Sequence, residues 1–237
     1  MKRRTRRILF WLAVAVFCVS TVVIVRYAQG YKYDFTARRF VLTGAVALTA
    51  NTDATLSVAD QTIGSLSLLS HRGGEDRLLP GSYSIRLERD GFTTWRKEAV
   101  VQEGLLTDFP RVLLLSSDEA AVADLRDEAS RSLAGAFSKI DTATSLLIGS
   151  GAKGYMPSDN GDRMLWWTRN ELWVVWVRST DYQPYHVAGD RELVTRWSVP
   201  ITKAAWFRGR DHIVVNLSGS YRVIETDTRG GTNIVRF

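Results

Sequence analysis

The 237-residue chain carries 31 Lys and Arg against 25 Asp and Glu, a formal net charge of +6, and 45% of its residues are hydrophobic. Six of the basic residues and none of the acidic ones lie in residues 1–26, which leaves 25 basic against 25 acidic side chains in residues 27–237. The excess positive charge is confined to the N-terminus, which disfavours nucleic-acid binding by the rest of the chain.

The chain opens with a short basic segment, residues 1–7, followed by eighteen uncharged and mostly apolar residues, Ile8–Val25. An eighteen-residue helix is about 27 Å long, close to the roughly 30 Å of a bilayer's hydrocarbon core. We therefore predict a transmembrane helix over residues 8–26 that anchors the chain in the lipid bilayer. Basic residues are retained on the cytoplasmic side, so we expect a cytoplasmic N-terminus and an extracytoplasmic remainder in the cell envelope.

Two other interpretations of this segment remain. A cleaved secretory signal also joins a basic and an apolar part, and Ala28-Gln29-Gly30 is the nearest cleavage site, but we favour the anchor because the apolar run is longer than a signal's. Lipid attachment at Cys18 is disfavoured because bulky Phe17 precedes it, so we interpret Cys18 as an apolar helix residue. It is the only cysteine, so the outer region forms no internal disulfide and depends on a packed core.

Residues 27–39 are polar with scattered aromatics, which predicts a juxtamembrane stalk with tyrosines at the level of the lipid headgroups: Tyr27, Tyr31 and Tyr33. From 40 to 116, short alternating runs are broken by turn residues, the pattern of a small antiparallel β-sandwich. The clearest strand is Ser82–Arg89, in which Tyr83, Ile85 and Leu87 share one face. Asp90-Gly91 predicts a hairpin turn, and residues 92–101 the returning strand.

Residues from about Tyr27 to Leu115 resemble the PEGA domain, a small β-sandwich module of bacterial and archaeal surface and membrane proteins. The resemblance lies in Leu79-Pro80-Gly81 with the strand that follows, and in Asp90-Gly91-Phe92. It implies an envelope-associated binding or structural module without catalytic residues. The tetrapeptide that names the family is absent: Asn51-Thr52-Asp53-Ala54 stands in its place, so an Asn/Asp turn replaces the Pro-Gly turn.

Residues 117–143 have a different texture. Apolar residues recur at intervals of three or four, which predicts an amphipathic helix with Ser117 as its N-cap: Val122, Leu125, Ala129, Leu133 and Phe137. The alternative is an irregular linker, because the segment is also rich in Ser, Asp and Gly.

Residues 144–237 predict a second β region made of short apolar strands: 146–148, 163–168, 171–177, 204–207, 212–217, 221–225 and 233–237. Met164–Trp167 aligns with His212–Val215, a period of about 45–50 residues that is close to that of a propeller blade. About two such blades are present, too few to close a ring. Either the natural chain continues, or the strands form an open sheet whose edge is covered or pairs with another subunit.

Tryptophans are concentrated in this region. Trp173 and Trp176 are three residues apart and so point to opposite faces of a strand, which makes exposure of one of them an option. We favour packing in the core. The alternative is an exposed aromatic patch, with Trp166, Trp173 and Trp176 as candidates, that binds cell-envelope polysaccharide or a membrane protein.

No catalytic, cofactor or metal-binding pattern is evident. His71, His186 and His212 are far apart in the sequence and lack spaced metal-ligating companions. Asp159-Asn160-Gly161-Asp162 lacks the other ligands of a calcium loop, so we interpret it as a hairpin turn. We predict an all-β, single-pass, non-enzymatic binding or structural module, or alternatively a sensor or enzyme-associated domain built on an incomplete β-propeller.

Overall fold

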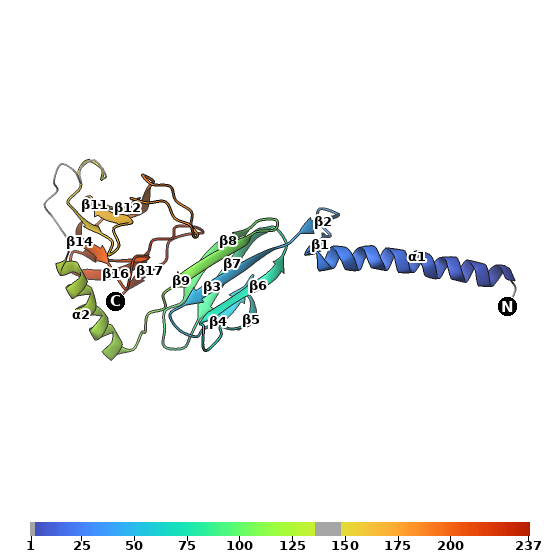
Figure 1. Cartoon of the computed structure of the whole chain (residues 1–237). Helices are drawn as coiled ribbons and strands as arrows, with labels where there is room; N and C mark the ends of the chain where they lie inside the picture. The colour runs from blue at the N-terminus through green and yellow to red at the C-terminus, as the bar shows by residue number, and fades with distance from the viewer. Residues whose placement is uncertain (1–2, 136–147) are drawn as a thin grey trace. The chain divides into compact units, whose positions relative to one another are not determined.

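The computed structural model describes residues 3–135 and 148–237 (Figure 1). It consists mostly of strands in several antiparallel sheets, preceded by one N-terminal apolar helix, which confirms the predicted fold class. The chain divides into two compact units: the first unit comprises Met1–Val46, Gly74–Ser82 and Val100–Thr107, and the second unit comprises Ala47–Gly73, Tyr83–Ala99 and Asp108–Phe237.

Helix α1 (Arg3–Ala28) has 26 residues, none of them buried, and among the described residues it is the helix long and apolar enough to cross a membrane. It contains neither Pro nor Gly, so its backbone hydrogen bonds are uninterrupted. The Thr21 hydroxyl donates to the Phe17 carbonyl over 2.8 Å, which satisfies the polar group inside the helix. Gly30, at φ +87°, ends the helix in a conformation that favours glycine.

The predicted stalk contains a two-stranded antiparallel sheet of β1 (Tyr31–Asp34) and β2 (Arg39–Leu42). The turn between the strands is stabilised by Asp34, whose carboxylate accepts from the backbone N–H groups of Thr36 at 2.8 Å and Ala37 at 3.1 Å.

The predicted sandwich region forms two sheets. One has the order β6-β3-β9, and the other has the order β5-β4-β7-β8. Ile85 and Leu87 are fully buried, as the alternation along the predicted strand indicates. The bounds of the seven strands are β3 (Gly44–Ala50), β4 (Thr55–Val58), β5 (Gln61–Ser65), β6 (Arg72–Leu78), β7 (Gly81–Glu88), β8 (Trp95–Val101) and β9 (Leu106–Val112).

The turn after β7 differs from the predicted one. Gly91 has a φ of +75° whereas Asp90 has a negative φ, and the Phe92 N–H donates to the Arg89 carbonyl over 3.1 Å. Phe92 bridges to Ser116 rather than opening the returning strand, so β8 begins at Trp95. The connection is therefore wider than a two-residue hairpin loop.

Asn51 shapes the turn after β3. Its side-chain amide donates to the Leu114 carbonyl over 3.0 Å and its side-chain oxygen accepts from the Leu114 N–H over 2.8 Å. The side chain thus pairs with the backbone just beyond β9 as a further strand residue would. These bonds hold in place the Asn/Asp turn that the sequence predicted here.

Helix α2 (Glu119–Ala134) confirms the predicted amphipathic helix, although not its cap. Asp118, not Ser117, is the N-cap, because its carboxylate accepts from the Ala121 N–H over 3.3 Å. Phe137, and residues 146 and 147 of the predicted strand 146–148, lie outside the described residues.

The C-terminal strands form two four-stranded antiparallel sheets, each in consecutive order. The first contains β10 (Gly154–Pro157), β11 (Arg163–Trp167), β12 (Glu171–Trp176) and β13 (Arg191–Arg196). The second contains β14 (Ile201–Trp206), β15 (His212–Leu217), β16 (Ser220–Glu225) and β17 (Ile234–Arg236). The segments aligned as an internal repeat occupy β11 and β15, the second strand of each sheet, which supports that alignment. Within the described residues these sheets do not close a ring.

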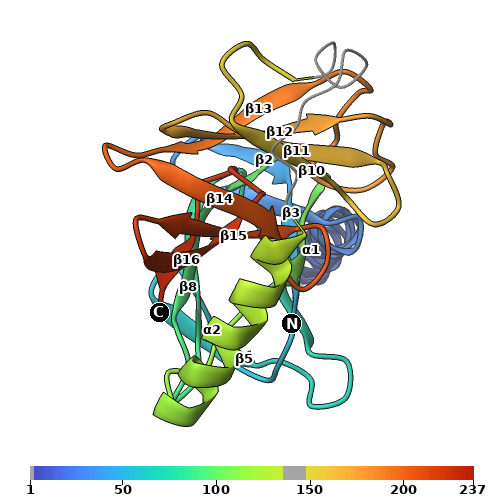
Figure 2. The same ribbon diagram turned by 90° about the vertical axis from the view of Figure 1, so that its left-hand side faces the viewer.

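Both C-terminal sheets are buried on two faces. One core lies between them and contains, for example, Leu165 and Trp176 from the first sheet and Ile213 from the second. The opposite face of the second sheet packs against α2. Leu125 and Leu133 meet three strand residues there, together with Phe207 just after β14: Ala205, Val214 and Val223. Figure 2 shows α2 lying across this sheet.

β8 is an edge strand whose backbone is covered by residues 230–233. The Glu98 N–H donates to the Gly230 carbonyl over 3.2 Å. The Asn233 side chain accepts from the Arg96 N–H at 3.2 Å and donates to the Arg96 carbonyl at 3.0 Å. This edge is therefore not free to recruit another strand.

Candidate functional site

The three tryptophans proposed as partner-binding residues do not form one exposed patch. Trp166 and Trp176 are 4% and 2% exposed, whereas Trp173 is partly buried. As predicted, Trp173 and Trp176 pack on opposite faces of β12. Trp173 stacks on Trp166 with ring centroids 5.3 Å apart, and Trp166 packs so closely over Gly149 that a Cβ there would lie 2.4 Å from its ring. Trp166 and Trp176 are therefore core residues. Partner binding through Trp173 stays a prediction.

The histidines are likewise packed side chains. His186 stacks on Trp176 with ring centroids 3.5 Å apart, and His212 is 7% exposed at the start of β15. Burial lowers the pKa of His212 to about 4, although Asp211 opposes the shift. Across residues 3–135 and 148–237, no group of three or more His, Cys, Asp or Glu side chains has the arrangement of a metal site.

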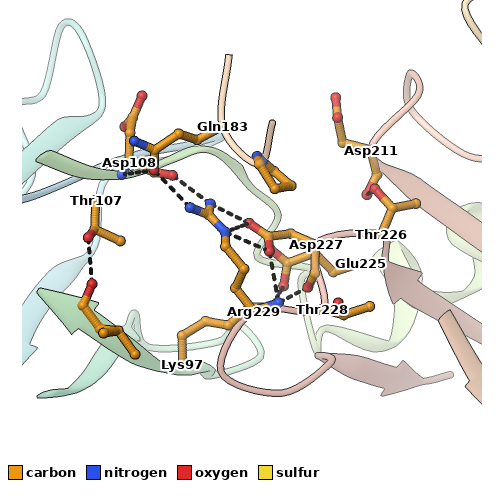
Figure 3. A network of polar contacts seen from close by, with 12 residues as sticks. Lys97, Thr107, Asp108, Gln183, Asp211, Glu225, Thr226, Asp227, Thr228 and Arg229 are labelled. Atoms are coloured by element: carbon orange, nitrogen blue, oxygen red, sulfur yellow. Dashed lines mark hydrogen bonds and ion pairs between the residues drawn. The ribbon is translucent and has the colours of Figure 1, made fainter. Parts of the chain in front are cut away.

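The structure instead brings together a buried ionic cluster that the sequence did not predict (Figure 3). We call it the Lys97 network, and its members are Trp95, Lys97, Glu225, Asp227, Arg229, Gly231 and Asn233. Figure 3 labels four of them: Lys97, Glu225, Asp227 and Arg229. All of these residues belong to the second unit. They connect β8 with the segment between β16 and β17.

Lys97 lies at the centre of the network, and its side chain is fully buried. Its ammonium contacts a Glu225 carboxylate oxygen at 3.3 Å, and it donates to the Gly231 carbonyl at 2.6 Å and to the Asp227 carbonyl. A lysine ammonium has three N–H bonds. Two of them therefore go to backbone carbonyls, and the ammonium lies beside the Glu225 carboxylate as its counter-charge.

Glu225 is the counter-charge of Lys97. Its Oε2 also accepts from the indole N–H of Trp95 at 3.1 Å and from the Asn233 amide at 2.9 Å. Burial raises the pKa of Glu225 above its ordinary value, and the nearby Lys97 ammonium partly offsets the shift. The carboxylate is thus held by two hydrogen bonds and one ion pair, and its side chain is 7% exposed.

Arg229 extends the network toward β9. Its guanidinium forms a two-oxygen pair with Asp227, at 2.6 Å for the Nη2–Oδ2 contact. It also donates to the Asp108 carbonyl at 2.7 Å and to the Gln183 side chain at 2.8 Å. The planar group lies over the Phe109 ring, 4.7 Å from its centroid.

A small pocket of about 30 Å³ adjoins the network and is lined by charged and aromatic side chains, among them Arg111, Arg163, Trp176, Tyr182, His186 and Asp211. Asp211 accepts from Arg111 at 2.8 Å and from Arg163 at 3.1 Å. Arg163 also donates to the Tyr182 hydroxyl. A space of this volume holds one or two water molecules rather than a substrate.

Two nitrogens in the pocket lack a hydrogen-bond partner among the described residues: Arg163 Nε and His186 Nε2. Burial lowers the pKa of His186, although Asp190 opposes the shift. Burial likewise raises the pKa of the neighbouring Glu192 despite a hydrogen bond from Thr228. In both side chains burial disfavours the charged form.

The sequence did carry a signal for the network. Lys97 occupies the same face of β8 as Trp95 and Ala99, and all three are buried. A lysine at a buried position of an alternating strand requires a buried partner. The identity of that partner was not predictable, because Glu225 is 128 residues further along the chain.

Neither a family model nor a curated protein matches the chain. One matching solved structure is a protein of unknown function from Bacteroides fragilis that is described as membrane-associated. It is 10% identical, with a TM-score of 0.25, and the match covers 82% of the present chain and 94% of the other. So low a TM-score supports no conclusion about a shared fold or activity.

Proposed function

We propose that this chain is a single-pass membrane protein of the cell envelope, with a cytoplasmic N-terminus and a β-rich extracytoplasmic part that serves as a non-enzymatic binding or structural module. The observation that carries the proposal is α1, a 26-residue apolar helix with no buried residue. Outside a membrane, so long an exposed apolar surface would drive aggregation. The basic residues before the apolar run support the orientation.

The interior of the second unit supports a structural rather than a catalytic role. In the Lys97 network the ammonium and the Glu225 carboxylate are both engaged by protein groups. Buried, mutually satisfied charges hold segments in a fixed arrangement. The resemblance of residues 27–115 to the PEGA domain, an envelope-associated module, points the same way.

The orientation is tested with the full chain carrying a tag after Phe237. In cells from which outer layers have been removed, we expect externally added protease to remove the tag while a cytoplasmic marker survives. The intact mass of the purified protein should include residues 1–26. Protection of the tag would refute the orientation, and loss of Ile8–Val25 from the mature protein would refute the anchor.

The partner that we propose for the displayed part is cell-envelope polysaccharide or another membrane protein, with Trp173 as the accessible aromatic. A pull-down with the detergent-solubilised chain tests this proposal. We expect Trp173→Ala to lose captured material, with Tyr185→Ala as a control for removal of an exposed ring, since Tyr185 is 69% exposed. Equal capture by both variants and the wild type would exclude Trp173.

A second candidate is a sensor or enzyme-associated domain built on an incomplete β-propeller. It is favoured by the two consecutive four-stranded sheets that pack face to face. A third blade would have to stack on an outer face, and α2 occupies that of the second sheet. Natural relatives with further blade repeats after the equivalent of Phe237 would favour this candidate, whereas relatives that retain the α2 apolar face and end there would favour the first.

A further inference from the structure

The hairpin of β1 and β2, immediately after α1, has one aromatic face. Tyr33 pairs with Phe40 and Tyr31 with Leu42 across the strands, and residues directly opposite each other share a face. The Tyr33 ring meets the Phe40 ring edge to face at 5.3 Å, and Phe35 in the turn meets Tyr33 at 5.0 Å. We call Tyr31, Tyr33, Phe35 and Phe40 the aromatic face of the hairpin.

This face is left largely open to solvent. Phe35 is 84% exposed, Phe40 47% and Tyr33 38%. Large apolar side chains gathered on one exposed surface mark an interaction site, whereas single ones do not. A two-stranded sheet is also marginally stable in water on its own, so a partner that covers this face would stabilise it.

Charge and chain length point to the occupant. Residues 26–39 hold four basic residues and one acidic one, which gives the hairpin and its junction with α1 a net positive charge: Arg26, Lys32, Arg38 and Arg39. The Arg26 guanidinium lies over the Tyr31 ring, 5.1 Å from its centroid. β1 starts three residues after α1 ends, so it lies within about 11 Å of the end of the helix. Aromatic rings and basic groups at that distance from a membrane span are typical of the headgroup region.

We propose that the aromatic face of the hairpin lies in the headgroup region of the same bilayer that α1 spans, with Phe35 inserted most deeply. This inference rests on the membrane anchoring proposed above and adds a second membrane contact to it. A helix alone leaves rotation about its own axis free. A hairpin held flat on the bilayer next to it removes that freedom, so the anchored end of the chain has one orientation on the membrane.

Spin-label depth measurements on the full chain in vesicles of phosphatidylcholine and phosphatidylglycerol test the proposal. Native Cys18, exposed near the middle of α1, carries the label that reports on the anchor. In a Cys18→Ala background, Phe35→Cys reports on the aromatic face, and Lys32→Cys, exposed on the other face of the same strand, is the matched control. Neither substitution removes a buried side chain, so both variants should keep the fold.

We expect a label at Cys18 to collide with oxygen far more often than with a water-soluble nickel chelate. The ratio of the two collision rates should be several-fold higher at position 35 than at position 32. If the ratio is the same at positions 35 and 32, whether both labels are in water or both are in lipid, the inference is overturned and the anchor is unaffected. A water-exposed label at Cys18 would instead refute the anchor, and the inference with it.

Discussion

At the scale of single residues, the second unit buries ionisable groups whose charge is managed in different ways. His212 is kept uncharged by its surroundings, since burial outweighs the attraction of Asp211 and lowers its pKa to about 4. Lys97 keeps a counter-charge within 3.3 Å. Substitutions of His212 and Lys97 should therefore affect the unfolding free energy in different ways.

His212 should make the protein less stable in acid. Its pKa falls from 6.5 to about 4 on folding, so its contribution is complete above pH 6.5 and is lost as the pH falls toward 4. A shift of this size corresponds to about 3 kcal/mol of unfolding free energy. We expect urea titrations of the detergent-solubilised chain between pH 7 and 4 to show a shallower loss of stability for His212→Gln than for the wild type. Parallel pH curves would contradict this.

Removal of the Lys97 ammonium should be costly, because it leaves Glu225 buried without a counter-charge. We expect Lys97→Met to lower the unfolding free energy by about 3–5 kcal/mol, measured by urea titration. Lys97→Met combined with Glu225→Gln should recover part of that loss, since the neutral amide keeps an acceptor for Trp95. Arg96→Met is the control: its side chain is 66% exposed and its ion pair is long, so we expect a change below about 0.5 kcal/mol. Equal losses for the single and double variants would show that charge burial is not the cause.

Single residues also show where sequence reasoning reaches its limit. The position of Lys97 on a buried strand face follows from the alternation around it, whereas its partners come from a segment that only the fold brings near. Asn51 was assigned to a turn correctly. Its bonds to Leu114 depend on a strand pairing 63 residues away along the chain, and local patterns do not contain that information.

At the scale of elements, the contact between β8 and residues 230–233 depends on a glycine. Gly230 has a φ of +61°, and a Cβ at this position would lie 2.0 Å from the Glu98 carbonyl oxygen. Gly161, at φ +67°, has nothing within 4 Å of the same point. An alanine would therefore strain the backbone at both positions, but it would clash with a neighbouring segment only at position 230.

We expect Gly230→Ala to lower the unfolding free energy more than Gly161→Ala, by an additional 1–3 kcal/mol or so, because the side chain forces the two backbones apart. Gly161→Ala should cost about 1 kcal/mol, the ordinary penalty of a left-handed residue. Urea titrations of both variants give the difference. If the two losses are the same, residues 230–233 are not closely packed against β8.

Elements with strong local patterns were predicted, and those without them were missed. β7 has a clear alternation of apolar and polar residues and β15 a clear apolar run, and both appear where expected. In contrast, β13 (Arg191–Arg196) carries three charged residues and was not predicted. It is a strand because it pairs with β12, with a bulge near Trp173. The cap of α2 moved by one residue for a similar reason: both Ser117 and Asp118 are good caps, and backbone geometry selects between them.

At the scale of the whole molecule, each of the two C-terminal sheets has two apolar faces. Packing the sheets on each other covers only one face of each, so the two outer faces need cover from other parts of the chain. Leu125, Ala129 and Leu133 of α2 cover the outer face of the second sheet. Ile148 and the partly buried Ala152, which precede β10, contribute to covering the outer face of the first sheet. Here a helix, rather than a further sheet, covers the outer face of the second sheet.

This arrangement predicts what happens when α2 is detached. Leu125 and Leu133 are each 4% exposed, so Leu125→Ser with Leu133→Ser removes two buried side chains, at a cost of about 2–5 kcal/mol each. The uncovered face of the second sheet would present Phe207, Val214 and Val223 to solvent. We expect the detergent-solubilised variant to self-associate, with a larger mass by light scattering than the wild type at the same concentration.

The matched control changes two residues of α2 on its solvent side, Asp124→Ser with Arg126→Ser, both of which are exposed. It keeps the apolar contacts and should have the wild-type mass. If the leucine variant also keeps that mass and its unfolding free energy is unchanged, α2 is not what covers the sheet. If both variants self-associate, the uncovered apolar face is not the shared cause, because only the leucine variant uncovers it directly. The cause is then a loss of helix stability or of surface charge.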